Sequence, residues 1–208
     1  MNVVNQNTRK KGQGQVNKFK NKMAKEKKRK KFFDVEIPLI GKETHLQAYD
    51  IKELEGKTIK YDLTRFLKGK GMIIKLKVKV DGEKAIATPI ETKLMPYFLK
   101  RMVRKGTNYV EDSFSTECKN AQIRIKPFLI TRRKVSRAVR KTLRNKAKEK
   151  LMEYVKDKDT ETLFDDILKN QMQKPLSLKL KKIYPLSLCE IRVFKIEKET
   201  LKKSVKKE

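Results

Sequence analysis

The stretch Tyr97–Val155 reads YFLKRMVRKGTNYVEDSFSTECKNAQIRIKPFLITRRKVSRAVRKTLRNKAKEKLMEYV. Its order of apolar and charged residues predicts a basic amphipathic helix, then a pair of strands, then a second and longer basic helix. Both helices carry an apolar stripe on one side and arginine and lysine over the rest. The stretch therefore predicts a packed scaffold with a positively charged coat.

The last third of this stretch has the spacing of an amphipathic α-helix. Apolar residues recur every fourth position at Val135, Val139, Leu143, Ala147, Leu151 and Val155, and Ala138 and Tyr154 widen the stripe. Like charges four residues apart destabilise a helix by about 0.2–0.5 kcal/mol per pair, so an unrelieved basic run indicates an external polyanion. The alternative is a solvated face, but such faces usually mix both signs. The basic residues of this run are Arg132, Arg133, Lys134, Arg137, Arg140, Lys141, Arg144, Lys146, Lys148 and Lys150.

The chain has 208 residues and a net charge of +30. A charge of this size concentrates a protein on nucleic acid or on an anionic membrane. The membrane is disfavoured, because the sequence contains no run of about 20 apolar residues, no signal peptide, and no glycine after Met1 for lipid attachment. A nucleic acid is the predicted partner, and the cytoplasm is the predicted location.

The chain divides by composition into three parts. Residues 1–30 are rich in lysine and poor in apolar residues, and they predict an RNA-binding arm that is disordered when free, with a short helix near 16–30 once bound. A nuclear-import signal is the alternative. Residues 31–196 predict one α+β domain, and residues 197–208 a lysine-rich tail. In the arm and at the start of the domain, the residues expected to contact RNA are Lys10, Lys11, Lys28, Arg29, Lys30 and Lys31.

Several predicted strands follow one another without helices between them. Strands are expected at 32–37, 57–63 and 71–80, with a short strand or loop at 45–50. Asp81-Gly82 predicts a tight turn from 71–80 into a strand at 84–90. A second hairpin is expected from 109–118 and 121–130, with Gln122, Arg124 and Lys126 on one face and Ile123 and Ile125 on the other. This succession predicts an antiparallel, β-barrel-like sheet with flanking α-helices.

The remaining elements are predicted from apolar spacing and punctuation. A first helix is expected from Thr92 to Lys105, with Leu94, Tyr97, Phe98, Leu99 and Met102 on its buried side and Gly106 as its stop. Helices are also expected over 159–169, with Thr160 as N-cap, and over 170–183. A strand at 186–196 would return to the sheet.

No residue set predicts catalysis, a cofactor or a small-molecule substrate. Cys118 and Cys189 form no CxxC pair and the single His45 is remote, so free buried thiols are expected rather than a metal site. The neighbouring carboxylates Asp165 and Asp166 point in different directions on a helix and are read as charge near its start. No phosphate-binding loop, dinucleotide turn or recognised DNA-binding signature occurs.

The low aromatic content disfavours stacking on single strands as the main mode of binding. Contact with the phosphates of a folded RNA, as in a ribonucleoprotein particle, is the predicted mode. An acidic side near Glu161–Asp166 is expected to dock a neighbouring protein. The alternative function is a free-standing RNA-binding chaperone or nucleic-acid-modifying enzyme.

A collinear set of short segments resembles a known family. These are Lys30-Lys31-Phe32-Phe33-Asp34-Val35 with Pro38, then Tyr97–Arg104 with Lys105-Gly106-Thr107, then Arg124-Ile125-Lys126-Pro127, and finally Lys182-Ile183-Tyr184-Pro185 with Glu190-Ile191-Arg192. Over residues 30–196 their order and spacing are similar to the S-three-a-e family of small-subunit ribosomal proteins from archaea and eukaryotes. The chain lacks the long C-terminal extension of eukaryotic members, which favours an archaeal type or a reduced eukaryote.

The resemblance implies a β-barrel-like core, no catalytic activity, and a place on the platform of the small ribosomal subunit near the messenger RNA exit. The implied partners are ribosomal RNA and neighbouring ribosomal proteins, and contact with messenger RNA stays open. The family's pattern implies that the following residues face RNA: Arg101, Arg104, Lys105, Thr107, Lys126, and the basic residues from Arg132 to Arg144. Arg124 is added because it shares the charged face with Lys126.

Overall fold

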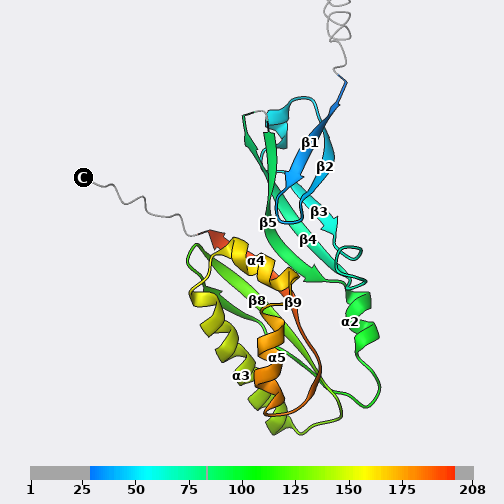
Figure 1. The fold of residues 1–208 in the computed structure, drawn as a ribbon, viewed down its shortest axis with the longest axis vertical. Helices are drawn as coiled ribbons and strands as arrows, with labels where there is room; N and C mark the ends of the chain where they lie inside the picture. The colour runs from blue at the N-terminus through cyan, green and yellow to red at the C-terminus, as the bar shows by residue number, and fades with distance from the viewer. Residues whose placement is uncertain (1–28, 83, 200–208) are drawn as a thin grey trace, which may run out of the picture.

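The computed structural model describes residues 29–82 and 84–199, which form a nine-stranded sheet with helices packed on it (Figure 1). The predicted α+β class is confirmed. The sheet is open and mixed rather than purely antiparallel, because β1 runs parallel to β5. The predicted arm residues Lys10, Lys11 and Lys28, and residues 16–28 of the predicted helix, lie outside the described residues. Of the tail predicted over 197–208, residues 197–199 belong to β9 and the rest lies outside the described residues. The strands are β1 (Lys31–Ile37), β2 (Lys42–Ala48), β3 (Thr58–Asp62), β4 (Met72–Asp81), β5 (Lys84–Leu94), β6 (Tyr109–Glu111), β7 (Phe114–Glu117), β8 (Ala121–Thr131) and β9 (Leu186–Glu199).

Strand β5 organises the N-terminal half of the sheet. One of its edges pairs with β4 along its whole length, through the predicted hairpin at Asp81-Gly82. Its other edge pairs first with β1 and then with β9. Gly82 has a φ of +64°, which glycine adopts at little cost. The predicted alternation along β4 is confirmed, because Ile74, Leu76 and Val78 are fully buried while Lys77 and Lys79 are exposed.

Strand β8 organises the C-terminal half. It pairs with β9 over its whole length, and β9 is thus the predicted returning strand. The other edge of β8 pairs with two short strands, so the single strand expected over 109–118 is wrong: β6 ends at Glu111 and β7 begins at Phe114. The buried Pro127 explains this break. It has no N–H to donate, and it lies between the β8 residues that pair with β7 and those that pair with β6.

The helices begin and end at different residues from those predicted. The first helix is shorter than the predicted 92–105, because Thr92 and Leu94 belong to β5 and the chain turns only at Pro96. The long helix begins after Ser136, whose hydroxyl accepts a hydrogen bond from the Val139 N–H. Asp159, rather than the predicted Thr160, is the N-cap of the next helix. The α-helices are α2 (Pro96–Met102), α3 (Arg137–Lys156), α4 (Thr160–Leu168) and α5 (Gln173–Lys181), and a 3-10 turn, η1, spans Ile51–Leu54.

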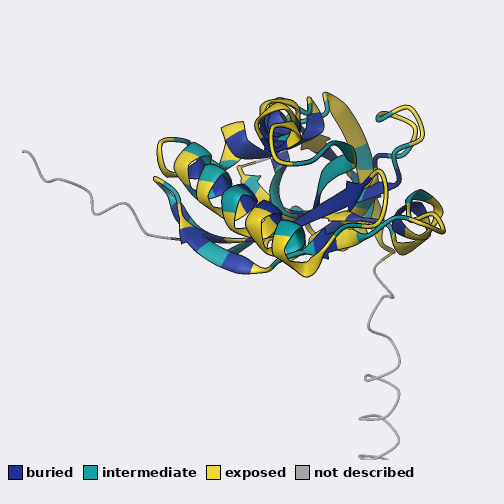
Figure 2. Ribbon diagram, turned by 90° about the horizontal axis from the view of Figure 1, so that it is seen from below, coloured by how far each residue is buried: buried dark blue, intermediate teal, exposed yellow. Residues whose placement is uncertain are grey.

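The apolar stripe of α3 is confirmed over most of its length. Leu143, Ala147, Leu151 and Val155 are at most 1% exposed, and Figure 2 shows buried and exposed residues on opposite sides of this helix. The stripe fails at its start, where Ala138 is exposed and Val135 precedes the helix. On α2, Phe98 and Leu99 are buried as expected, but Tyr97 is 48% exposed.

Both cysteines are free and half-buried. Burial, with the nearby Glu190 carboxylate, raises the pKa of the Cys189 thiol to about 12, so this thiol stays protonated at neutral pH. In the part of the chain that the structure describes, no group of His, Cys, Asp and Glu side chains is arranged to hold a metal ion. No helix of the described residues has the length and apolar character to cross a membrane.

The two neighbouring aspartates of α4 have different environments. Asp166 is 7% exposed; its Oδ2 lies 2.6 Å from the Lys158 Nζ and accepts a hydrogen bond from the Tyr154 hydroxyl at 2.9 Å. Burial alone would lower the pKa of Lys158, but its hydrogen bonds to Asp166 and Tyr154 raise that pKa above its ordinary value. Asp165 instead forms an exposed pair with Lys169. Asp166 therefore joins α4 to the end of α3, and it is not part of a surface acidic side as predicted.

Replacing Asp166 with Asn should lower the free energy of unfolding by about 1–3 kcal/mol, because the Lys158 ammonium would lose its charged partner in a partly buried site. Urea unfolding measures this difference. Asp165→Asn is the matched control and should change stability by at most about 0.5 kcal/mol, since its ion pair is solvated. Equal effects of the two variants would contradict the assigned geometry.

Candidate nucleic-acid interface

Two groups of described basic residues differ in their ion pairs, and other described cations such as Lys77, Lys148 and Lys179 also form no ion pair. In the first group, four lysines of the second half of α3 and beyond have carboxylate partners: Lys146 with Glu149, Lys150 with Glu153, Lys158 with Asp166 and Lys169 with Asp165. Among the described residues, no ion pair involves the basic residues of α2, of the turn after it, or of the segment 132–144. We call this second group the unpaired basic cluster, and it consists of Lys100, Arg101, Arg104, Lys105, Arg132, Arg133, Lys134, Arg137, Arg140, Lys141 and Arg144.

Asn108 and Thr131 bring the two halves of the unpaired basic cluster together. The Thr131 N–H donates to the Asn108 carbonyl at 2.9 Å, and the Asn108 N–H donates to the Thr131 hydroxyl at 3.1 Å. The Asn108 side-chain oxygen accepts a hydrogen bond of 2.9 Å from the Val135 N–H. Arg104 and Lys105 therefore lie on a turn that is hydrogen-bonded to the loop carrying Arg132 and Arg133, although about 27 residues separate them in sequence.

This loop is not part of α3. The connection between Thr131 and Ser136 carries Arg132, Arg133 and Lys134, which are all exposed. The prediction that these residues lie on the long helix is therefore wrong. Thr131 is fully buried, and its hydroxyl lies 2.8 Å from the Arg133 carbonyl. A basic loop anchored at a buried threonine can contact a phosphate backbone, and the start of α3 continues it with Arg137 and Lys141 exposed.

Some predicted residues are held by the protein itself. Arg124 forms an ion pair with Glu197 at 2.7 Å, so its charge is already compensated. The Arg144 Nε donates to the Glu111 carbonyl at 3.2 Å. Thr107 is half-buried and its hydroxyl donates to the Arg104 carbonyl at 2.7 Å. This hydrogen bond stabilises the turn and occupies the hydroxyl proton that an RNA contact would use. Lys126 is half-buried on β8.

The residues at the start of β1 lie apart from the unpaired basic cluster. Arg29, Lys30 and Lys31 are exposed, and the Lys30 Nζ lies 5.7 Å from the ring centroid of Tyr49. Figure 1 places the start of β1 at the opposite end of the molecule from the start of α3. The structure thus brings together the residues predicted on α2 and before α3, and it leaves those of the β1 start as a separate basic site.

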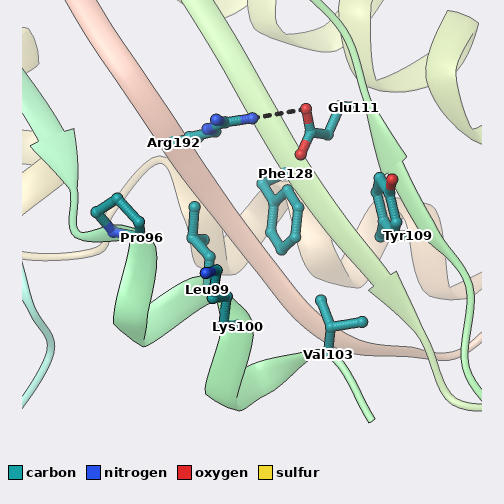
Figure 3. A pocket seen from close by; sticks show the side chains of 8 residues that line it. All are labelled: Pro96, Leu99, Lys100, Val103, Tyr109, Glu111, Phe128 and Arg192. Carbon is teal, nitrogen blue, oxygen red and sulfur yellow. Dashed lines mark hydrogen bonds and ion pairs between the residues drawn. The ribbon is translucent and has the colours of Figure 1, made fainter. Parts of the chain in front are cut away.

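Three residues near the cluster escaped the sequence analysis. Asn108 positions the two basic segments, and Tyr109 and Arg192 lie on the sheet face that α2 covers (Figure 3). Asn108 could have been found, because a polar residue directly after a Gly-Thr turn commonly bonds the backbone. Arg192 could not, because its position depends on a bulge between two strands that are remote in sequence.

A family model and several curated proteins match this chain. Residues 18–200 match the model of the Ribosomal S3Ae family. A protein of Nanoarchaeum equitans named "Small ribosomal subunit protein eS1" is 28% identical over 186 residues, covering 85% of this chain and 93% of that protein. Proteins of the same name from Pyrobaculum arsenaticum and Halorubrum lacusprofundi are 26% and 27% identical, covering 66% and 57% of this chain and 64% and 55% of their own lengths.

These matches define the class of protein: it is a ribosomal protein. Such a protein is a structural component rather than an enzyme, and it acts within the ribosome in the cytoplasm. The chain belongs to the Ribosomal S3Ae family. The family resemblance read from the sequence is confirmed, and the alternative of a nucleic-acid-modifying enzyme is no longer needed.

Asn108→Ala should lower the free energy of unfolding by about 1–2 kcal/mol, because the Val135 N–H loses its side-chain acceptor in a partly buried position. Hydrogen exchange should show faster exchange of the Val135 amide, while the amides of β4 keep their protection. Asn145→Ala, at an exposed position of α3, is the control and should change neither measurement. Unchanged exchange at Val135 in the Asn108 variant would contradict the positioning role.

Proposed function

We propose that this protein is a structural constituent of the small ribosomal subunit and binds folded ribosomal RNA through phosphate contacts made by the unpaired basic cluster. The observation that carries the proposal is a concentration of unpaired cations on one surface. Among the described residues, the cations at 100–105 and 132–144 form no ion pair, and the sequence has no Asp or Glu from residue 118 to residue 148. Asn108 and Thr131 tie the two segments together. Phosphates would supply the missing negative charge.

The relatives' names support the ribosomal part of this proposal, since each is called a small ribosomal subunit protein. Ribosomal RNA and neighbouring ribosomal proteins are then the partners. The proposal includes the position implied by the family resemblance, on the platform near the messenger RNA exit. It also assigns RNA binding to the basic residues of the arm at 1–30 and to Arg29, Lys30 and Lys31, while 31–196 acts as the folded domain.

The salt dependence of RNA binding tests the phosphate contacts. Replacing Arg133, Arg137 and Lys141 with Ala should reduce the slope of log affinity against log salt concentration by about two to three units, because each lost phosphate contact removes about 0.7–0.9. Filter binding of the full chain to small-subunit ribosomal RNA from the source organism measures the slope.

The control removes the same charge from residues that have carboxylate partners. Replacing Lys146, Lys150 and Lys169 with Ala also changes the net charge by three, but these cations are neutralised within the protein. Its slope should change by less than about one unit. Equal changes in the two triple variants would mean that only net charge matters, and would contradict the assigned surface.

Sedimentation of a native extract tests the ribosomal assignment. The protein should co-migrate with the small subunit in a sucrose gradient and stay there after a high-salt wash, because an integral constituent makes many contacts at once. Immunoblotting follows the protein. Release at moderate salt, or migration at the top of the gradient, would show a peripheral binder and overturn the proposal.

A further inference from the structure

A mostly apolar pocket lies on the face of β8 and β9 that α2 covers. Its volume is about 410 Å³, which falls in the range of small-ligand pockets. Leu99 of α2 and Val103, the residue after this helix, form one wall, and Tyr109 and Phe128 form the other (Figure 3). The larger helices lie behind the sheet in this view. The pocket opens beside the unpaired basic cluster, because Lys100 lines it.

The second wall of the pocket is an aromatic platform. The rings of Tyr109 and Phe128 are stacked, with centroids 5.9 Å apart and an interplanar angle of 23°. Phe128 is 3% exposed and holds the platform in the core, whereas Tyr109 is 55% exposed. A rigid, exposed tyrosine beside basic side chains is a surface on which an unpaired nucleobase can stack.

The pocket also contains a hydrogen-bond donor and an acceptor side by side. The Arg192 Nη1 lies 2.8 Å from the Glu111 Oε2, and Figure 3 shows both side chains at the same end of the pocket. The register shift between Lys126 and Pro127 moves the β9 partner from Val193 to Ile191, so Arg192 has no partner on β8. Such a bulge re-aims a side chain, here towards Glu111.

Basic residues lie on and near the α2 wall of the pocket. Lys100 lies on its α2 wall, and Arg101 and Arg104 are exposed on the same helix and the turn after it. On the other side, the Arg144 Nε donates to the carbonyl of Glu111, the residue whose side chain lines the pocket. A group that enters the pocket therefore lies close to Lys100 and Arg192, and to the segment that carries Arg101 and Arg104.

We propose that one unpaired nucleobase of the ribosomal RNA inserts into this pocket, stacks near Tyr109 and places its polar edge at Arg192 and Glu111. This inference rests on the proposed function and deepens it, since it adds a base contact to the phosphate contacts. A base matches all three features: a flat aromatic body, polar edge groups, and an anionic backbone that stays outside beside the cations. An apolar side chain of a neighbouring protein would match only the walls.

Two variants test the inference in the full chain. Tyr109→Ala removes the exposed ring of the platform, and Val103→Trp fills the pocket. Each should weaken binding to small-subunit ribosomal RNA by about 5- to 100-fold at fixed salt, the loss expected for one stacked base. The salt slope should stay unchanged, because no phosphate contact is removed. Phe66→Ala, an exposed aromatic outside the pocket, and Leu178→Trp, at an exposed site on α5, are the controls and should bind as the wild type does.

Each outcome has a distinct meaning. Weaker binding of both pocket variants with an unchanged slope, in proteins whose thermal unfolding matches the wild type, supports the base pocket. Wild-type RNA affinity of both variants overturns it while leaving the phosphate contacts intact. Wild-type RNA affinity with loss of incorporation into small subunits also overturns it, and assigns the pocket to a neighbouring protein. Failure of the wild-type chain to bind this RNA would overturn the proposed function itself.

Discussion

The pairing of β9 between β5 and β8 is the interaction on which the rest of the structure depends. On one side it joins Glu91–Lys93 of β5 to residues about 100 positions later, and on the other it pairs along β8 with residues 55 to 78 positions apart. Phe194 is fully buried at this junction and meets Phe164 of α4 edge to face at 4.9 Å. The last strand thus connects the two halves of the sheet, and the C-terminal helices α4 and α5 pack against it. Because β9 is the last of the described strands in sequence, the two halves of the sheet are joined by a long-range contact.

Net charge is the second constraint, because +30 opposes a compact state. The fold places carboxylates where cations pack against other elements, as with Lys158 and Asp166 between α3 and α4, or Lys70 and Glu190 at 2.6 Å in a site where both side chains are less than 15% exposed. None of the described cations of 100–105 and 132–144 forms an ion pair. Binding of phosphates would relieve the charge repulsion on this surface.

Local patterns predicted local structure well. The four-residue spacing located the stripe of α3, the alternation located β4, and Asp81-Gly82 located the hairpin, because each depends on residues close in sequence. The errors arise where contacts between residues remote in sequence override the local pattern. Val135 fits the helical spacing, but Ser136 caps the helix and Asn108 holds Val135 outside it. Asp166 was read as surface charge because nothing in sequence shows that Lys158 and Tyr154 fold back over it. The basic residues were predicted from charge and from the family resemblance, while the residues that position them were not predicted.

Pro127 connects the irregular backbone to the candidate site. Because it lacks an N–H, it cannot complete the ladder of β8, and two irregularities meet there: the gap between β6 and β7, and the bulge opposite Arg192. A regular ladder would have alternated side chains evenly along β9 and given Arg192 a partner residue on β8. The bulge instead leaves it free to meet Glu111, the last residue of β6 before the gap. The irregular pairing at Pro127 therefore lies beside the pocket that contains Arg192 and Glu111. A departure from regular strand pairing at a binding site is expected where function, rather than stability, requires it.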